Sequence, residues 1–287
     1  MSLLSSQLQA FLGVATQGTV HGAAKGLYLT QTAVTQRLRG LEQSLGATLF
    51  TRTRRGMKLT PEGEALLRYC HAAKDLEGEA MAQIKGGGKT TFAHVCLMGP
   101  TSMMHARVVP HCVEAAKRFP RLLLQFHISD TEDGIQALQT GVSQLSIVQQ
   151  EQVTKEMASK SLQPEQYVLV CTAAWHSRSL KDIIKNERII DFDPTDPVTF
   201  NYLKEYKLFE SVNHERHFAN RTDTLAMMLS KGYGYGLLTM EFCQPYVEQH
   251  QLIILNEGKI YENHMALVWY PRADPPDYFA ALIDAIN

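Results

Sequence analysis

The sequence predicts a two-domain α+β/α-β chain, in which a small N-terminal domain and one long helix precede a larger α/β domain. At 287 residues the chain is longer than a typical single domain. Apolar residues recur at helical spacing through residue 85, whereas short apolar strands alternate with helical segments after residue 92. Gly86–Gly88 separates the two patterns and is the expected boundary.

Short helices are expected at the N-terminus. The first should end near Gly18 and the second near Leu27. Thr30 is placed to cap the third helix by accepting a hydrogen bond from a free amide of its first turn. Apolar residues of this third helix share one face and predict a buried stripe: Val34, Leu38, Leu41 and Leu45.

The opposite face of the third helix carries the short hydroxyls, amides and guanidinium groups that read base edges and phosphates when a helix lies in the DNA major groove. Residues 49–60 then predict two short strands around a basic, glycine-containing tip, a wing that can contact phosphates or the minor groove. A winged helix-turn-helix is therefore expected over residues 1–60. Its candidate DNA contacts are Thr30, Gln31, Thr32, Thr35, Gln36, Arg37, Arg39, Arg52, Arg54 and Arg55.

Charge is divided unevenly along a chain whose net charge is only −1. The first 60 residues hold seven basic side chains and one acid, Glu42, for a net charge of +6 that leaves −7 for the remainder. A compact basic domain suits binding to phosphate. A solvated basic face is the alternative that charge alone leaves open.

The N-terminal residues resemble the head of the LysR family of bacterial regulators. The matching positions are Ala23-Ala24, Leu27, Leu29 through Arg39, Leu41-Glu42, Leu45-Gly46, Leu49-Phe50, Arg52, Leu59-Thr60 and Gly63. His21-Gly22 departs from the family, which more often has Ser or Thr followed by Ala, and could alter a backbone contact without threatening the fold. The resemblance covers the whole chain but is weaker after residue 92.

A long helix is expected to begin at Thr60-Pro61-Glu62 and to reach about Lys85, within a linker of residues 61–88. Its apolar stripe is too long for so small a head to bury, which predicts pairing with a second copy. The stripe contains Leu66, Leu67, Cys70, Ala73, Leu76, Ala80 and Ile84, and Glu77 interrupts it. The resemblance implies that this helix makes a homodimer, which we expect to assemble further into a tetramer.

Residues 89–287 predict parallel α/β sheets with crossover helices. Expected strands are 94–98, 122–128, 144–148, 167–171, 189–192, 214–219, 235–238, 252–255 and 265–269, and the main expected helices are 101–119, 133–139, 222–231 and 276–286. The resemblance implies a two-lobed effector domain like that of periplasmic binding proteins. The lobes would be about 92–162 with 265–287, and 163–264.

A ligand cleft is expected beyond the carboxyl ends of the strands, against helix N-termini. Its candidate residues are Thr101, Ser102, Met103, Asp130, Gln149, Asn220, Arg221 and Thr222, for each of which ordinary capping is an equal alternative. Arg221 could clamp a carboxylate, which predicts a small polar or anionic metabolite. Asp130 and Asp223 could instead face an ammonium group and suit an amino acid.

The leading hypothesis is therefore a transcription regulator that binds double-stranded DNA at a partly palindromic site and responds to a small effector. An enzyme with a DNA-binding head is the alternative from another class, but no catalytic motif supports it, and a purely architectural DNA binder is the third. No cofactor or metal is expected, and the scattered cysteines predict buried reduced thiols. RNA polymerase is a further conceivable partner. Without an apolar run of membrane length, a cytoplasmic protein is expected.

Overall fold

The computed structural model describes residues 4–54, 56–84, 92–272 and 275–287, with the backbone alone over 74–84. Two compact units divide the chain. One contains Met1–Cys96, Pro120–Gln125 and Ile135–Gln144, and the other contains Leu97–Phe119, Phe126–Gly134 and Leu145–Asn287. None of the described helices is both long and apolar enough to cross a membrane.

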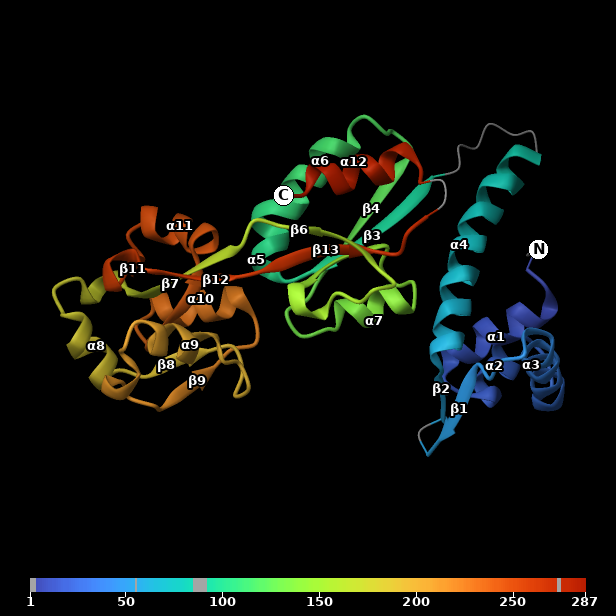
Figure 1. The fold of residues 1–287 in the computed structure, drawn as a ribbon, viewed down its shortest axis with the longest axis horizontal. Helices are drawn as coiled ribbons and strands as arrows, with labels where there is room; N and C mark the ends of the chain where they lie inside the picture. The colour runs from blue at the N-terminus through green and yellow to red at the C-terminus, as the bar shows by residue number, and fades with distance from the viewer. Residues whose placement is uncertain (1–3, 55, 85–91, 273–274) are drawn as a thin grey trace. The chain divides into compact units, whose positions relative to one another are not determined.

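The head begins with helices α1 (Ser6–Gln17), α2 (Val20–Gly26) and α3 (Gln31–Leu45), seen at the N-terminal end of Figure 1. A hydroxyl caps each helix, and Thr30 caps α3 by accepting a hydrogen bond from the amide of Ala33 at 3.1 Å, which confirms the expected start. The stripe on α3 is buried except at Leu45, whose side chain is 50% exposed, so that part of the prediction was wrong. Leu45 is the last residue of α3, and the left-handed Gly46 turns the chain away there.

Strands β1 (Phe50–Thr53) and β2 (Gly56–Leu59) form the expected antiparallel wing, in which Phe50 pairs with Leu59. The amide of Met57 donates a hydrogen bond of 2.8 Å to the carbonyl of Gly18, which fastens the wing to the end of α1. Arg55, at the predicted basic tip, lies outside the described residues.

Helix α4 (Pro61–Ile84) starts where the sequence predicts, with the Thr60 hydroxyl accepting from the amide of Gly63 at 3.0 Å. Leu67 and Cys70 are buried in the head's own core, and Leu66 and Ala73 pack against it. The head therefore buries the first half of a stripe that we expected to be a pairing surface. The second half of the stripe (Leu76, Ala80 and Ile84) and Glu77, which interrupts it, lie where the structure describes no side chains. The expected glycine break, Gly86–Gly88, lies outside the described residues.

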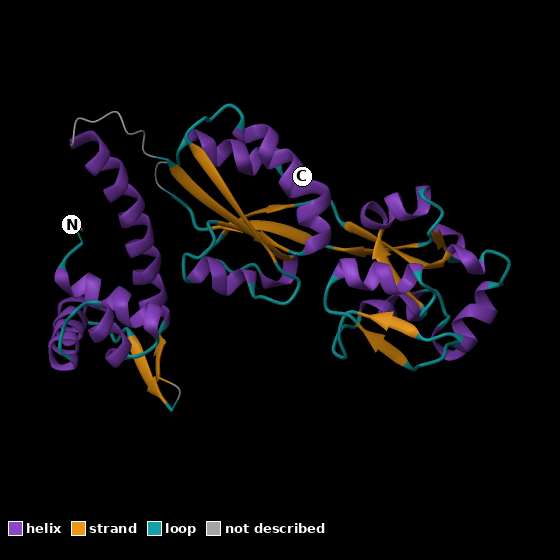
Figure 2. Cartoon of the chain, turned by 180° about the vertical axis from the view of Figure 1, so that it is seen from behind, coloured by secondary structure: helices purple, strands orange, loops and turns teal. Residues whose placement is uncertain are grey.

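The C-terminal region contains two sheets, each with helices against it (Figure 2). The first sheet has the order β4 (Leu122–Ile128), β3 (Ala93–Gly99), β5 (Leu145–Gln149), β13 (Met265–Trp269) and β6 (Ala158–Ser161). The second has the order β11 (Leu252–Ile254), β7 (Glu165–Thr172), β10 (Tyr235–Thr239), β8 (Ile189–Asp191) and β9 (Arg216–Phe218), and β12 (Ile260–Asn263) also pairs with β7.

Both sheets are mixed, so the expectation of parallel sheets holds only in part: β3 pairs parallel with β5, and β8 pairs parallel with β9 and β10. β7 runs antiparallel to β10, β11 and β12, and β13 runs antiparallel to β5 and β6. The chain leaves the first sheet after β6 and returns to it after β12, and each strand that follows a crossing enters its sheet in the reverse direction. β6 and β12 were missed because their sequences, ASKS and IYEN, are short and half polar.

The helices of this region follow the predicted order, with additions. The expected helix over 101–119 is α5 (Thr101–Met103), a π-helical turn at Met104–Val108 and α6 (Val109–Ala116), on which the C-terminal α12 (Asp277–Ala285) packs. The remaining helices are α7 (Gly134–Gln139), α8 (Leu180–Asn186), α9 (Val198–Glu205), α10 (Thr222–Ser230) and α11 (Met240–Glu248).

All five cysteines are buried, as expected. Burial raises the pKa of the Cys112 and Cys171 thiols to about 12 and that of Cys243 to about 11, because desolvation disfavours the thiolate. Thiols that stay protonated at neutral pH are poor nucleophiles and poor metal ligands.

Gly234, between α10 and β10, supports a stability prediction. A Cβ atom there would lie 2.2 Å from the backbone oxygen of Arg188. We expect Gly234→Ala to lower the free energy of unfolding by about 1–3 kcal/mol, since the backbones must separate to admit the methyl group. Urea unfolding followed by tryptophan fluorescence measures this, because Trp175 and Trp269 both lie in the C-terminal region. Gly26→Ala in α2, with open space around it, should leave the tryptophan transition unchanged. Equal midpoints for the two variants would contradict the close approach.

Candidate functional site

The N-terminal end of α3 presents polar side chains to solvent. Gln31, Thr32, Gln36 and Arg39 are exposed, and Thr35 and Arg37 are half-buried. The Thr35 hydroxyl donates to the carbonyl of Gln31 at 2.8 Å, and it keeps its lone pairs for another donor. The side chains of Thr32 and Gln36 make no hydrogen bond within the described part of the chain, so their polar groups are available to a ligand.

His21, where the sequence departs from the family pattern, reaches this surface. Its ring nitrogen Nδ1 lies 3.1 Å from Nε2 of Gln31. Sequence reasoning treated His21 only as a change near the backbone and missed this contact, which crosses from α2 to α3. The pair holds Gln31 in place at the start of the helix.

The wing adds guanidinium groups to the head. Arg52 and Arg54 are exposed, and no ion pair within the described ranges neutralises either one. The Thr53 hydroxyl donates to the carbonyl of Gly56 at 3.0 Å and stiffens the hairpin next to its tip. The head thus brings amides and hydroxyls on a helix together with unpaired cations on a hairpin, which are the groups that bind duplex DNA.

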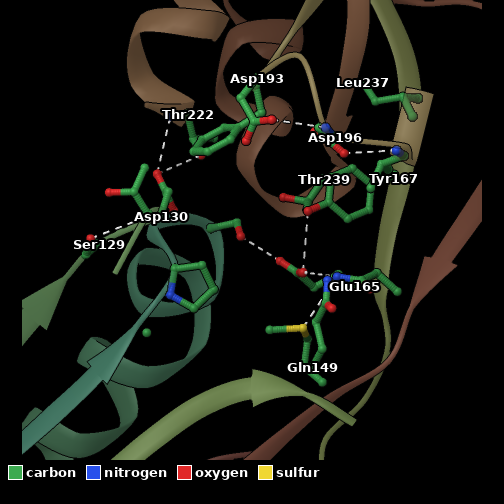
Figure 3. Close-up of a pocket in the computed structure, with 18 of the residues that line it drawn as sticks. Ser129, Asp130, Gln149, Glu165, Tyr167, Asp193, Asp196, Thr222, Leu237 and Thr239 are labelled. Carbon is green, nitrogen blue, oxygen red and sulfur yellow. Dashed lines mark hydrogen bonds between the residues drawn. The ribbon is translucent and has the colours of Figure 1, made fainter. Parts of the chain in front are cut away.

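The C-terminal region contains a cavity of about 610 Å³, within the size range of small-molecule sites. Its walls come from the carboxyl ends of strands in both sheets: Asp130 follows β4, Gln149 ends β5, Asp191 ends β8 and Thr239 ends β10. Figure 3 shows Asp130, Glu165, Asp193 and Asp196 around this space.

Asp130 joins the helices of the two sheets at the rim of the cavity. Its carboxylate accepts hydrogen bonds from the amide of Thr101 at 2.6 Å and from the Thr101 hydroxyl at 2.7 Å, at the start of α5. It also accepts from the Thr222 hydroxyl at 3.3 Å, at the start of α10 (Figure 3). Asp130 therefore caps one helix from each sheet.

Glu165 lies at the base of the cavity and is 2% exposed. The Ser102 hydroxyl donates to it at 2.5 Å, the Asn263 amide at 3.1 Å and the Tyr167 hydroxyl at 3.5 Å. Burial raises the pKa of this carboxyl, although the hydrogen bonds from Ser102 and Asn263 oppose the rise.

Arg107, on the π-helical turn, holds the two sheets at the place where the chain crosses between them. Its Nε lies 2.9 Å from both carboxylate oxygens of Glu241, at the start of α11. Its terminal nitrogens donate to the backbone oxygens of Gln163 and Pro164, in the segment that joins β6 to β7. One guanidinium thus ties a helix of the first sheet to a helix of the second and to the crossing segment.

The predicted ligand residues divide into two groups. Four of them line the cavity: Ser102, Asp130, Gln149 and Thr222. Thr101 does not line it, but its hydroxyl donates a hydrogen bond to Asp130. Met103 is fully buried, and Asn220 and Arg221 do not line the cavity. Arg221, the expected carboxylate clamp, is largely exposed and pairs at 3.0 Å with Asp223, two residues further on.

Sequence reasoning missed most of the acidic lining. The missed residues are Glu132, Asp133, Glu165, Asp191, Asp193 and Asp196, together with Tyr167 and Asn263. The run Asp-Phe-Asp-Pro-Thr-Asp at 191–196, which begins at the end of the expected strand 189–192, was a usable signal. The described lining contains neither lysine nor arginine. The cavity therefore offers no cationic side chain to bind the anionic metabolite that the sequence suggested.

The comparisons with known proteins agree with this arrangement. Residues 5–64 match the model of the bacterial regulatory helix-turn-helix protein, lysR family, and residues 91–287 match the LysR substrate binding domain. The chain belongs to the LysR family of transcription regulators. It is a DNA-binding transcription regulator that an effector modulates through the C-terminal domain.

Several relatives and structures illustrate the likeness. YofA of Bacillus velezensis, a HTH-type transcriptional regulator, is 27% identical over 219 residues, covering 68% of this chain and 75% of its own. HdfR of Yersinia pestis is 52% identical over 62 residues, which cover 22% of this chain and 21% of its own. ArgP of Mycobacterium tuberculosis aligns with a TM-score of 0.76 at 19% identity, covering 99% and 96% of the two chains. Full-length LysG of Corynebacterium glutamicum with bound effector Arg has a TM-score of 0.71 at 18% identity, covering 98% and 95%.

The raised pKa of Glu165 leads to a pH-dependent prediction. Because the folded protein holds the Glu165 proton more tightly than the unfolded chain, this residue's contribution to stability falls as pH rises from its ordinary pKa through the raised one. Glu165→Gln removes that titration and keeps an oxygen for Asn263 and an amide for Ser102. We expect the Tm of wild type, relative to the Gln variant, to fall across this range and then to level off.

Glu165→Leu is the matched control, because it removes the charge and the hydrogen-bond acceptor together. It should cost about 1–3 kcal/mol for each buried donor left unpaired, at every pH. Parallel Tm-against-pH curves for wild type and Glu165→Gln would contradict the raised pKa.

Proposed function

We propose that the chain binds a specific, partly palindromic DNA duplex as a homodimer, with α3 in the major groove and the wing on the backbone. The observation that carries this proposal is that the same head exposes Thr32 and Gln36 on α3, with no hydrogen-bond partner among the described residues, and Arg52 and Arg54 on the wing, with no ion pair. Short amides and hydroxyls discriminate bases, whereas unpaired guanidinium groups bind phosphates of any sequence. The two classes of residue therefore have separable roles.

We further propose that the cavity of the C-terminal domain is the effector site. It opens at the carboxyl ends of strands, where α/β domains bind ligands, and it lies within the region that matches a substrate binding domain. Full-length LysG, which shares this fold, has been solved with its effector Arg bound, and this likeness supports effector binding here. An effector that contacts both walls would favour one arrangement of the sheets and so change how the dimer bends DNA.

Base recognition can be separated from phosphate binding by substitution on the head. Gln36→Ala should cost about 1–3 kcal/mol at particular base pairs and little at others, because a base-specific bond is lost. Arg52→Ala should instead weaken binding on all sequences and reduce the salt slope by about 0.9, as one phosphate contact is removed. Fluorescence anisotropy with a set of single-base operator variants at several salt concentrations measures both.

Gln43→Ala is the control for this experiment. Gln43 is also an exposed glutamine of α3, about 10 Å further along the helix axis, beyond the N-terminal end that enters the groove. It should bind as wild type does. A uniform loss for Gln36→Ala over all operator variants would place Gln36 among the phosphate contacts instead.

Dimer formation through α4 can be tested by placing charged side chains on its apolar stripe. Leu76→Glu with Ile84→Glu should produce monomers in light scattering, because apposed carboxylates would face each other along the seam. Tyr69→Glu, on an exposed position of the same helix, is the matched control and should leave the mass unchanged. If the double variant keeps the mass of a dimer, the seam lies elsewhere.

A further inference from the structure

The charge of the proposed effector site is one-sided. Seven carboxylates occur among the described residues that line the cavity, which include no lysine or arginine. They are Asp130, Glu132, Asp133, Glu165, Asp191, Asp193 and Asp196. The cavity and the substrate-binding match define the site, and the carboxylates bear only on what it binds.

The protein's own cations neutralise few of these groups. Asp191 pairs with Arg216 at 3.0 Å, and Glu132 lies 3.1 Å from the ring of His127. Asp130, Glu165, Asp193 and Asp196 make hydrogen bonds but no ion pair with any residue that the structure describes. Arg216 also lies close enough to lower the pKa of Asp193 and Asp196, but it is one cation facing three of the lining acids, so an anionic ligand would meet an excess of negative charge.

Asp193 and Asp196 each keep one carboxylate oxygen for a ligand. Oδ1 of Asp193 accepts from the Thr195 amide, the Thr195 hydroxyl and the Asp196 amide, at 2.6, 2.5 and 3.1 Å. Oδ1 of Asp196 accepts from the Val198 amide at 2.9 Å. Within the described residues, Oδ2 of neither side chain has a hydrogen-bond partner, and both side chains line the cavity.

These bonds fix the two carboxylates in position before any ligand arrives. The backbone amides hold the Oδ1 atoms, so a ligand that binds the Oδ2 atoms has little side-chain entropy to remove. Burial raises the pKa of Asp196, and the negative charges of Asp191 and Asp193 add to the rise, although the hydrogen bond from the Val198 amide and the charge of Arg216 oppose it. A bound cation would offset both the desolvation and the repulsion.

We propose that the effector is a small organic cation whose ammonium or guanidinium group is held by the Oδ2 atoms of Asp193 and Asp196. This inference rests on the proposed role of the cavity as the effector site. A guanidinium or an ammonium group supplies several donors and can satisfy both oxygens at once.

Calorimetry on the full chain with matched pairs of probes tests the charge requirement. The pairs are L-lysine with L-norleucine, L-arginine with L-citrulline, and 1,4-diaminobutane with 1,4-butanediol, and L-glutamate is the anionic probe. At least one cationic probe should bind, with its neutral partner at least tenfold weaker. Asp193→Asn and Asp196→Asn should each weaken that cation at least tenfold. Glu210→Gln, which removes an exposed acid outside the cavity, should not.

Each contrary outcome overturns the proposal. The proposal is wrong if a neutral or anionic probe binds as tightly as its cationic counterpart, or if no cationic probe binds at millimolar concentration. It is also wrong if both Asn variants bind the cation as tightly as wild type does. The comparison of probes on the wild-type chain stands even where a variant fails to fold. Footprinting on the promoter of the protein's own gene measures DNA binding separately. If the protein binds that promoter and responds to an anionic effector, the proposed cationic ligand is wrong and the proposed function still stands.

Discussion

The chain passes between the two sheets of the C-terminal region twice, and the site depends on that constraint. The crossings join β6 to β7 and β12 to β13, and the strands beside them pair so that Asn263 lies opposite Glu165. The base of the cavity is therefore formed by residues about a hundred positions apart. Because Arg107 holds the carbonyls of the first crossing and the carboxylate of Glu241, any rotation of the sheets must strain or break these bonds.

Glu165 shows how much the site depends on satisfied polar groups. A carboxylate this buried would be strongly unfavourable without partners, since removing a charge from water costs several kcal/mol. Its partners come from α5, from β7 itself and from β12, so the same bonds that stabilise the acid also connect both sheets. A ligand that displaces one of them would act directly on the connection between the sheets.

Local patterns in the sequence were sufficient for the head and insufficient for the cavity. The cap at Thr30, the stripe on α3 and the hairpin each depend on residues within a few positions of one another, and the structure has them where the sequence predicted. The prediction that Leu45 is buried was wrong, because exposure at the end of a helix depends on neighbouring segments, which the spacing of apolar residues does not reveal. The antiparallel direction of β7 and β13 was not predicted, because it is decided by the two crossings, which leave no pattern in the strands themselves.

Arg221 shows why the charge of the cavity lining could not be deduced from single residues. Its place before α10 suggested an anion clamp, but the side chain is satisfied by Asp223 and does not line the cavity. The acids that do line it come from separate segments and converge only in the fold. The net charge of −7 outside the first 60 residues was a better guide to the acidic lining than the one arginine, since an acidic domain can gather carboxylates in a cavity with few neutralising cations. The head and the body thus divide the charge of the chain: the head is basic, and the described cavity lining of the C-terminal region carries carboxylates without lysine or arginine.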